Sequence, residues 1–102
     1  PALGFLQSSL HDPSSVVRIA AARAFCRVGE CDQGLPVLVE QLQSPLEWVR
    51  LHAAIVLDEL DEKARPAVPE LKKALDDRHN KYVVRVANHA LNELEGTNNR
   101  VR

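Results

Sequence analysis

The residues of this chain that are suited to binding a metal or moving a proton are scattered along it. The histidines are His11, His52, His79 and His89. No two of them have the i,i+4 spacing of a zinc-binding helix, and the chain contains no HExxH motif. Asp76, Asp77 and His79 fall in one polar stretch, which is more typical of a solvated turn than of a cation site. The pattern predicts no metal and no cofactor.

Motifs for nucleophilic catalysis and phosphate binding are also missing. No serine lies in a G-x-S-x-G pattern, and the chain has no glycine-rich loop. Cys26 and Cys31 have neither C-x-x-C spacing nor that of a four-ligand zinc site, which favours two free thiols over a disulfide. We therefore expect this chain not to be catalytic.

The length and net charge of the chain limit the classes of molecule that it is expected to bind. A chain of 102 residues is enough for one small domain of about three helix pairs. The net charge is −1, whereas binding to nucleic acid usually requires a basic face. No run of apolar residues is long enough to span a membrane. We expect the partner to be a protein or another domain of the same polypeptide, and neither a nucleic acid nor a membrane.

Apolar residues recur at helical spacing in three successive pairs of segments. Loops are expected at residues 30–34 and 61–65, and Pro36 and Pro66 are expected in the first turns of the helices that follow. The predicted helix pairs cover residues 2–28, 34–60 and 66–94 of a domain at 1–96. Residues 97–102 are polar and are predicted to form a flexible tail.

Two patterns recur with a period of thirty-odd residues. They are Val17-Arg18, repeated as Val49-Arg50, and Leu35-x-x-Leu38-x-x-x-Leu42, repeated as Val68-x-x-Leu71-x-x-x-Leu75. Two helices per unit with this period are typical of a helical repeat array. The predicted fold class is all-α, an α-solenoid of about three antiparallel helix pairs.

The first repeat also carries a longer run of characteristic positions. They are Asp12-Pro13, Val17-Arg18, Ala20-Ala21, Ala24-Phe25, Val28-Gly29 and Pro36-x-Leu38. In order and spacing this run resembles the HEAT-like repeat family, in the variety found in phycobilin lyases and many bacterial scaffolds. The resemblance covers nearly the whole chain and implies a solenoid that binds other proteins without catalysing a reaction.

A shorter resemblance involves the end of the chain. Residues 86–101, VANHALNELEGTNNRV, are similar to the C-terminal end of some bacterial sulfatases that carry HEAT-like repeats after the catalytic domain. This alternative implies an accessory module that docks on the catalytic domain of a larger enzyme. A free-standing scaffold would be cytoplasmic, whereas part of a sulfatase would be periplasmic or exported.

The HEAT resemblance also assigns a role to several charged residues near the helix starts. In that family the arginine at the position of Arg18 and Arg50 bonds across to the aspartate turn of a neighbouring repeat. We expect Asp12 and Asp77 to take part in this structural ladder, rather than the arginines forming an anion-binding site. The third repeat departs from the pattern, because Val84 stands where the arginine would be.

Alignment of the second helices of the three pairs predicts five core columns. They are Val17/Val49/Val83, Ala21/Ala53/Ala87, Ala24/Val56/Ala90, Phe25/Leu57/Leu91 and Val28/Leu60/Leu94. At about 100° per residue these columns lie on one side of each helix. Alternating small and large residues let neighbouring helices approach closely and still fill the space between them.

Apolar residues also occur on the side of these helices opposite the core columns, where a surface helix is normally polar. In the second repeat they are Trp48, Leu51 and Ile55. The equivalent residues are Val16, Ile19 and Arg23 in the first repeat and Tyr82, Arg85 and His89 in the third. The HEAT resemblance implies that this side lines a concave wall. We predict a partner-binding ridge there, because tryptophan, tyrosine and arginine are typical of interface hot spots. The alternative is side chains that are half exposed between neighbouring helices.

The first helix lacks the lead-in turn of the later repeats. It carries Leu3, Leu6 and Leu10 on one stripe, and Phe5 beside them. We expect the array to begin before Pro1. Because the ends of a solenoid need a polar outer face, we also expect self-association through this uncapped helix.

Overall fold

The computed structural model describes residues 2–100, with side chains from residue 4 onward. Pro1, the side chain of Leu3 and residues 101–102 of the predicted tail therefore lie outside the described part. The elements are α1 (Ala2–Ser9), α2 (Ser15–Arg27), α3 (Cys31–Leu42), α4 (Glu47–Glu59), the 3₁₀ helix η1 (Asp61–Ala67), α5 (Val68–Ala74) and α6 (Lys81–Glu95). Over these residues the chain contains six α-helices and no strand, as the sequence predicts.

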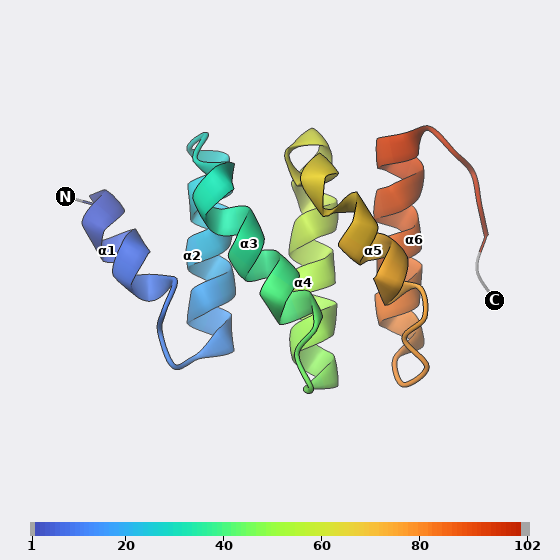
Figure 1. Cartoon of the computed structure of the whole chain (residues 1–102), viewed down its shortest axis with the longest axis horizontal. Coiled ribbons are helices and arrows are strands. Elements are labelled where there is room, and N and C mark those ends of the chain that lie inside the picture. Colours follow the sequence, from blue (N-terminus) through green and yellow to red (C-terminus); the bar gives the residue numbers. More distant parts are fainter. Residues whose placement is uncertain (1, 101–102) are drawn as a thin grey trace.

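The helices are arranged in two layers. Figure 1 shows α2, α4 and α6 standing side by side, with α3 and α5 crossing them in the other layer. The molecule is elongated, with extents of 45 × 27 × 16 Å, and its long axis runs across the three parallel helices. This stack of helix pairs confirms the predicted α-solenoid. None of its helices, over residues 2–100, is both long and apolar enough to cross a membrane.

The core lies between the two layers. Every residue that the aligned columns placed in the core of the second and third repeats is buried, so the prediction is confirmed there. In α2 the prediction is wrong at Val17 and Val28, which are exposed, and Ala24 is only half buried. Ala21 and Phe25 of the same columns are buried, so the prediction holds in the middle of α2 and fails near its two ends.

The helix ends are formed by a capping serine and by glycines in the left-handed conformation. Ser14 caps α2, with its side chain accepting from the backbone N–H of Val17. Gly29 and Gly96 follow α2 and α6 in the left-handed conformation, at φ of 86° and 65°, where a glycine is the least strained residue.

Two connections differ from the prediction. Helix α3 begins at Cys31 rather than after a loop at 30–34, so Pro36 lies inside the helix instead of in its first turn. Its start is favoured by Asp32, because a carboxylate stabilises the positive end of the helix dipole. The predicted loop at 61–65 is part of η1, which includes Pro66.

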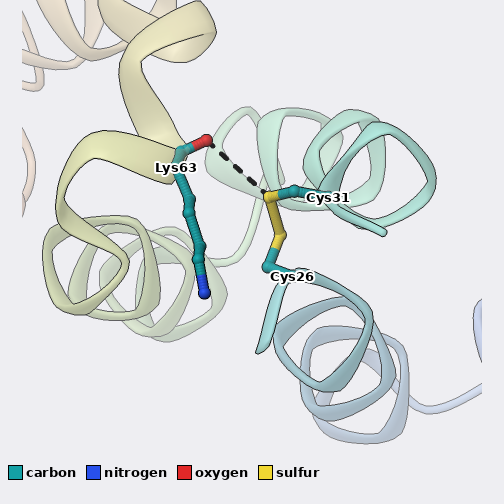
Figure 2. The surroundings of a disulfide bond; sticks show 3 residues. All are labelled: Cys26, Cys31 and Lys63. Carbon is teal, nitrogen blue, oxygen red and sulfur yellow. Dashed lines mark hydrogen bonds between the residues drawn. A yellow bond between two sulfur atoms is a disulfide. The ribbon is translucent and has the colours of Figure 1, made fainter. Parts of the chain in front are cut away.

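The expectation of two free thiols is also wrong. Cys26 and Cys31 form a disulfide that joins the end of α2 to the start of α3 (Figure 2). The left-handed turn at Gly29 reverses the chain and brings the two Cα atoms within 3.8 Å. Spacing rules for C-x-x-C and zinc motifs do not detect a pair that is brought together by a helix-to-helix turn.

The disulfide also touches the next repeat. The Sγ atom of Cys31 lies 3.7 Å from the carbonyl oxygen of Lys63 in η1 (Figure 2). A disulfide sulfur carries no hydrogen to donate, so this is a close sulfur–oxygen contact rather than a hydrogen bond. The bridge therefore joins two helices covalently and packs against a third element.

Reducing this disulfide is expected to lower the free energy of unfolding by about 2 kcal/mol, because the bridge closes only a short loop. Urea unfolding with and without reductant measures the difference. The matched control is the double variant Cys26→Ala, Cys31→Ala, whose stability should not respond to reductant. Equal unfolding midpoints for the oxidised and reduced wild-type chain would contradict the expectation.

Candidate protein-interaction surface

Three large side chains are exposed at equivalent positions of the three parallel helices. Val16, Trp48 and Tyr82 each stand one residue before a valine of the first core column, in α2, α4 and α6. Their exposed fractions are 47%, 52% and 53%. Because the three helices lie side by side, these residues form a line across the array, which we call the exposed row. A surface helix normally carries polar residues at such positions.

Helix α4 contributes further apolar surface beside the exposed row. Ile55, two turns beyond Trp48, is also exposed, and Leu51 between them is partly buried. These residues have the i, i+3, i+7 spacing of one helix face. The middle of the array is therefore the most apolar part of this side.

Ile19 does not belong to this surface, although the sequence suggested it. Its side chain is fully buried, on the side of α2 that packs against the next repeat. The equivalent residues are Leu51, which is half buried, and Arg85, which is exposed on the last helix. The extent of burial at this position therefore differs from repeat to repeat.

Two of the predicted ridge residues form contacts between neighbouring helices. Arg23 of α2 lies 3.0 Å from a carboxylate oxygen of Glu59 in α4. His89 of α6 forms a 2.8 Å hydrogen bond through Nδ1 to Asp58 in α4. This hydrogen bond, together with the negative charge of Asp58, raises the pKa of His89 above its ordinary value. Carboxylates of α4 therefore offset the positive charge at these two sites.

Positive charge gathers at the α6 end of the exposed row. Lys81 Nζ and the guanidinium carbon of Arg85 lie 5.5 and 5.8 Å from the centre of the Tyr82 ring, within cation–π distance. Neither residue forms an ion pair within the part of the chain that the structure describes. A shallow hollow between α4 and α6, lined in part by Glu47 and Arg78, adjoins Tyr82. This end can accept negative charge from a partner.

Arg50 and Asp77 link the second repeat to the turn before α6. Arg50 donates from Nε and Nη2 to the two carboxylate oxygens of Asp77, at 2.7 and 3.3 Å, and from Nη1 to the Ser44 carbonyl at 2.8 Å. Asp77 also accepts from the backbone N–H groups of His79 and Asn80. Burial raises the pKa of Asp77, but these hydrogen bonds and the Arg50 charge outweigh it and hold the pKa below its usual value.

Arg18 is bound differently, because the next turn offers Ser44 in place of an aspartate. Its Nη1 donates to the Asp12 and Pro13 carbonyls at 2.7 and 3.1 Å, and Nη2 donates to Oε1 of the buried Gln41 at 3.1 Å. The Asp12 carboxylate instead accepts from the N–H of Ser14. Since both guanidinium groups of the ladder bond within the protein, they do not offer a binding site for an external anion.

The described residues contain no group of three side chains placed to hold a metal ion. In the polar stretch of Asp76, Asp77 and His79, the Asp77 carboxylate is already engaged by Arg50 and two backbone N–H groups. The Asp77 carboxylate therefore serves to order the turn before α6.

Sequence reasoning missed the carboxylates that organise the middle of this surface. Asp58 forms a hydrogen bond with His89 of α6, and Glu59 forms an ion pair with Arg23 of α2. The sequence does contain a signal for these contacts. Glu59 follows Ile55 by four residues and therefore lies on the same face of α4. Arg23 and His89 occupy the positions equivalent to Ile55 in the other two repeats. Residues of one face on adjacent parallel helices are within reach of one another.

Comparison with known proteins agrees with this architecture. A family model described as HEAT repeats matches residues 3–92. This match is to HEAT repeats in general, and it supports neither the phycobilin-lyase variety nor the sulfatase resemblance that the sequence suggested. No curated protein matches the chain. From the family match over most of its length and from its stacked helix pairs, the chain belongs to the HEAT-repeat family.

Proposed function

We propose that this chain is a non-catalytic scaffold that binds a protein partner along the exposed row. The observation that carries the proposal is the alignment of Val16, Trp48 and Tyr82, all about half exposed, on three neighbouring helices. HEAT repeats are generally protein-interaction scaffolds. Aromatic residues at such a site supply much contact area at low cost in conformational entropy.

The composition of the surface indicates what the partner must present. Trp48, Ile55 and Tyr82 favour a segment with apolar side chains, which would remove their exposed area from water. Lys81 and Arg85 favour acidic residues at the α6 end of that segment. The segment belongs to a separate protein or to another domain of the same polypeptide.

Peptides selected from a random displayed library on the immobilised chain test this function. We expect Trp48→Ala to weaken their binding by more than about tenfold, because a central aromatic residue commonly contributes 2 kcal/mol or more. The matched control is Phe5→Ala, which removes an exposed aromatic ring from α1, a helix that carries no residue of the exposed row. Peptides that bind the two variants equally well would contradict the proposal.

A further inference from the structure

The disulfide between Cys26 and Cys31 is accessible from one side only. Cys26, in the last turn of α2, is fully buried, whereas Cys31, the first residue of α3, is partly exposed. A thiolate that exchanges with a disulfide must reach one of its two sulfur atoms, so access decides which of them is attacked. Attack from solvent is therefore expected at the Sγ atom of Cys31.

Cys31 lines a groove between α3 and the segment formed by η1 and α5, which we call the Cys31 groove. The apolar part of its lining consists of Leu35, Pro36, Val39 and Pro66. The groove has a volume of about 490 Å³, which is within the range of small-molecule sites. Lys63, whose carbonyl oxygen touches Sγ of Cys31, lines it on the η1 side (Figure 2). A small molecule bound in the groove would thus lie beside the disulfide.

The charges of the Cys31 groove indicate which small molecules fit it. Asp32, Lys63 and Glu70 also line the groove, so two acids and one base surround it. A ligand that carries carboxylates would meet more like charge than opposite charge there. An uncharged apolar group would instead contact Leu35 and Val39 and leave water. The groove therefore fits the uncharged apolar part of a small molecule.

We propose that Cys31 is a site of thiol–disulfide exchange with small apolar thiols, which bind with their apolar part in the Cys31 groove. The thiolate of the small molecule attacks Sγ of Cys31 and forms a new S–S bond, while the bond between the two cysteine sulfurs breaks. The electron pair of the broken bond leaves on the Cys26 sulfur, which takes a proton from water. The small thiol is oxidised and Cys26 is reduced, so no further oxidant is required.

The exchange opens the covalent link between α2 and α3. The released Cys26 thiol stays in the core, where a cysteine packs as a small apolar residue. The Cys31 groove belongs to the layer of α3 and α5, whereas the exposed row lies on α2, α4 and α6 (Figure 1). The proposal therefore does not depend on the proposed function.

Benzyl mercaptan and 2-mercaptoethanol test the proposal on the oxidised chain, because both are uncharged thiols and only the first carries an aromatic ring. Acid quenching at early times stops the reverse exchange, since only a thiolate attacks a disulfide. After the free thiols are blocked with N-ethylmaleimide, cleavage by trypsin at Arg27 separates the two cysteines for mass spectrometry. We expect the adduct on Cys31, and we expect benzyl mercaptan to react more than about tenfold faster.

Two substitutions in α3 test the role of the groove. Val39→Ser makes the apolar lining more polar and is expected to reduce the rate preference for benzyl mercaptan by at least about threefold. The matched control is Val37→Ser, the same change at a valine that is also partly buried against the core but does not line the groove. It should leave the preference unchanged. Helical circular dichroism establishes that both variants are folded before their rates are compared.

An adduct on Cys26 would overturn the proposal, and so would equal rates for the two thiols. An equal loss of preference in the two valine variants would also overturn it, because the groove lining would then not select the ring. The mapping and the comparison of the two thiols use the wild-type chain and do not depend on the variants. If the exchange behaves as expected but no peptide is selected on the exposed row, only the proposed function fails.

Discussion

Replacing Asp77 by alanine is expected to lower the free energy of unfolding by about 3 kcal/mol, the cost of removing one partner from a buried ion pair. The side chains of Arg50 and Asp77 are only 15% and 7% exposed, so the remaining guanidinium would stay largely shielded from water without its counter-ion. Two backbone N–H groups of the turn before α6 would lose their acceptor as well. Urea unfolding monitored by circular dichroism measures the loss.

The neighbouring residue provides the control. Asp76 is exposed, and Asp76→Ala removes the same charge from the same turn without breaking the pair. Its effect should stay within about 0.5 kcal/mol, as is usual for surface substitutions. If the two alanine variants are equally stable, the Arg50–Asp77 pair does not stabilise the junction between the last two repeats.

The same pair predicts a direction for the pH dependence of stability. The pKa of Asp77 is lower in the folded chain than in the unfolded chain, so the unfolded state binds the proton more tightly. The contribution of the pair is therefore fully present above the unfolded pKa of about 4 and is lost as the pH falls through the folded pKa. When the free energy of unfolding is measured at decreasing pH, the Asp77→Ala variant should lack this pH-dependent contribution.

The second large effect is expected from Gly34→Ala. Gly34 is buried in α3 where this helix crosses α2, and an added Cβ would overlap the Ala22 carbonyl oxygen and lie 3.0 Å from its carbon. Backbone atoms cannot rotate away as a side chain can, so the two helices must separate. We expect the free energy of unfolding to fall by about 3 kcal/mol, at the upper end of the usual cost of overpacking.

Gly4→Ala is the matched control, because it makes the same chemical change in a helix with no atom within 4 Å of the new Cβ. Alanine favours a helix over glycine by about 1 kcal/mol, so this variant should be neutral or more stable. The two substitutions are thus predicted to have opposite signs in the same unfolding assay. A Gly34→Ala chain as stable as wild type would show that α2 and α3 are not in close backbone contact.

The fold followed from the sequence because helical periodicity and the repeat register agree. Val83 and Leu94 were placed in the core by alignment alone, and both are buried. Val17 and Val28 occupy the same columns and are exposed, since periodicity identifies the apolar side of a helix but not whether a neighbour covers it. The same limit applies to Ile19, which the sequence placed on the ridge and which is fully buried.

The candidate site was less predictable because it depends on contacts between repeats. Trp48 and Tyr82 were found by their position opposite the core columns, and both are exposed. The ion pair of Arg23 with Glu59 and the hydrogen bond of His89 with Asp58 require the relative placement of three helices, which sequence spacing does not specify. The disulfide between Cys26 and Cys31 depends on the left-handed turn at Gly29 in the same way.

The most direct test of the exposed row uses Trp48, which is the single tryptophan of the chain. A selected peptide is titrated into the chain while tryptophan emission and its quenching by acrylamide are recorded. Binding along the row should shift the emission to shorter wavelength and reduce quenching, because Trp48, which is 52% exposed in the free chain, would leave water. A peptide that binds, as shown by its own fluorescence anisotropy, while Trp48 remains equally quenched would contradict the assignment of the exposed row as the partner-binding surface.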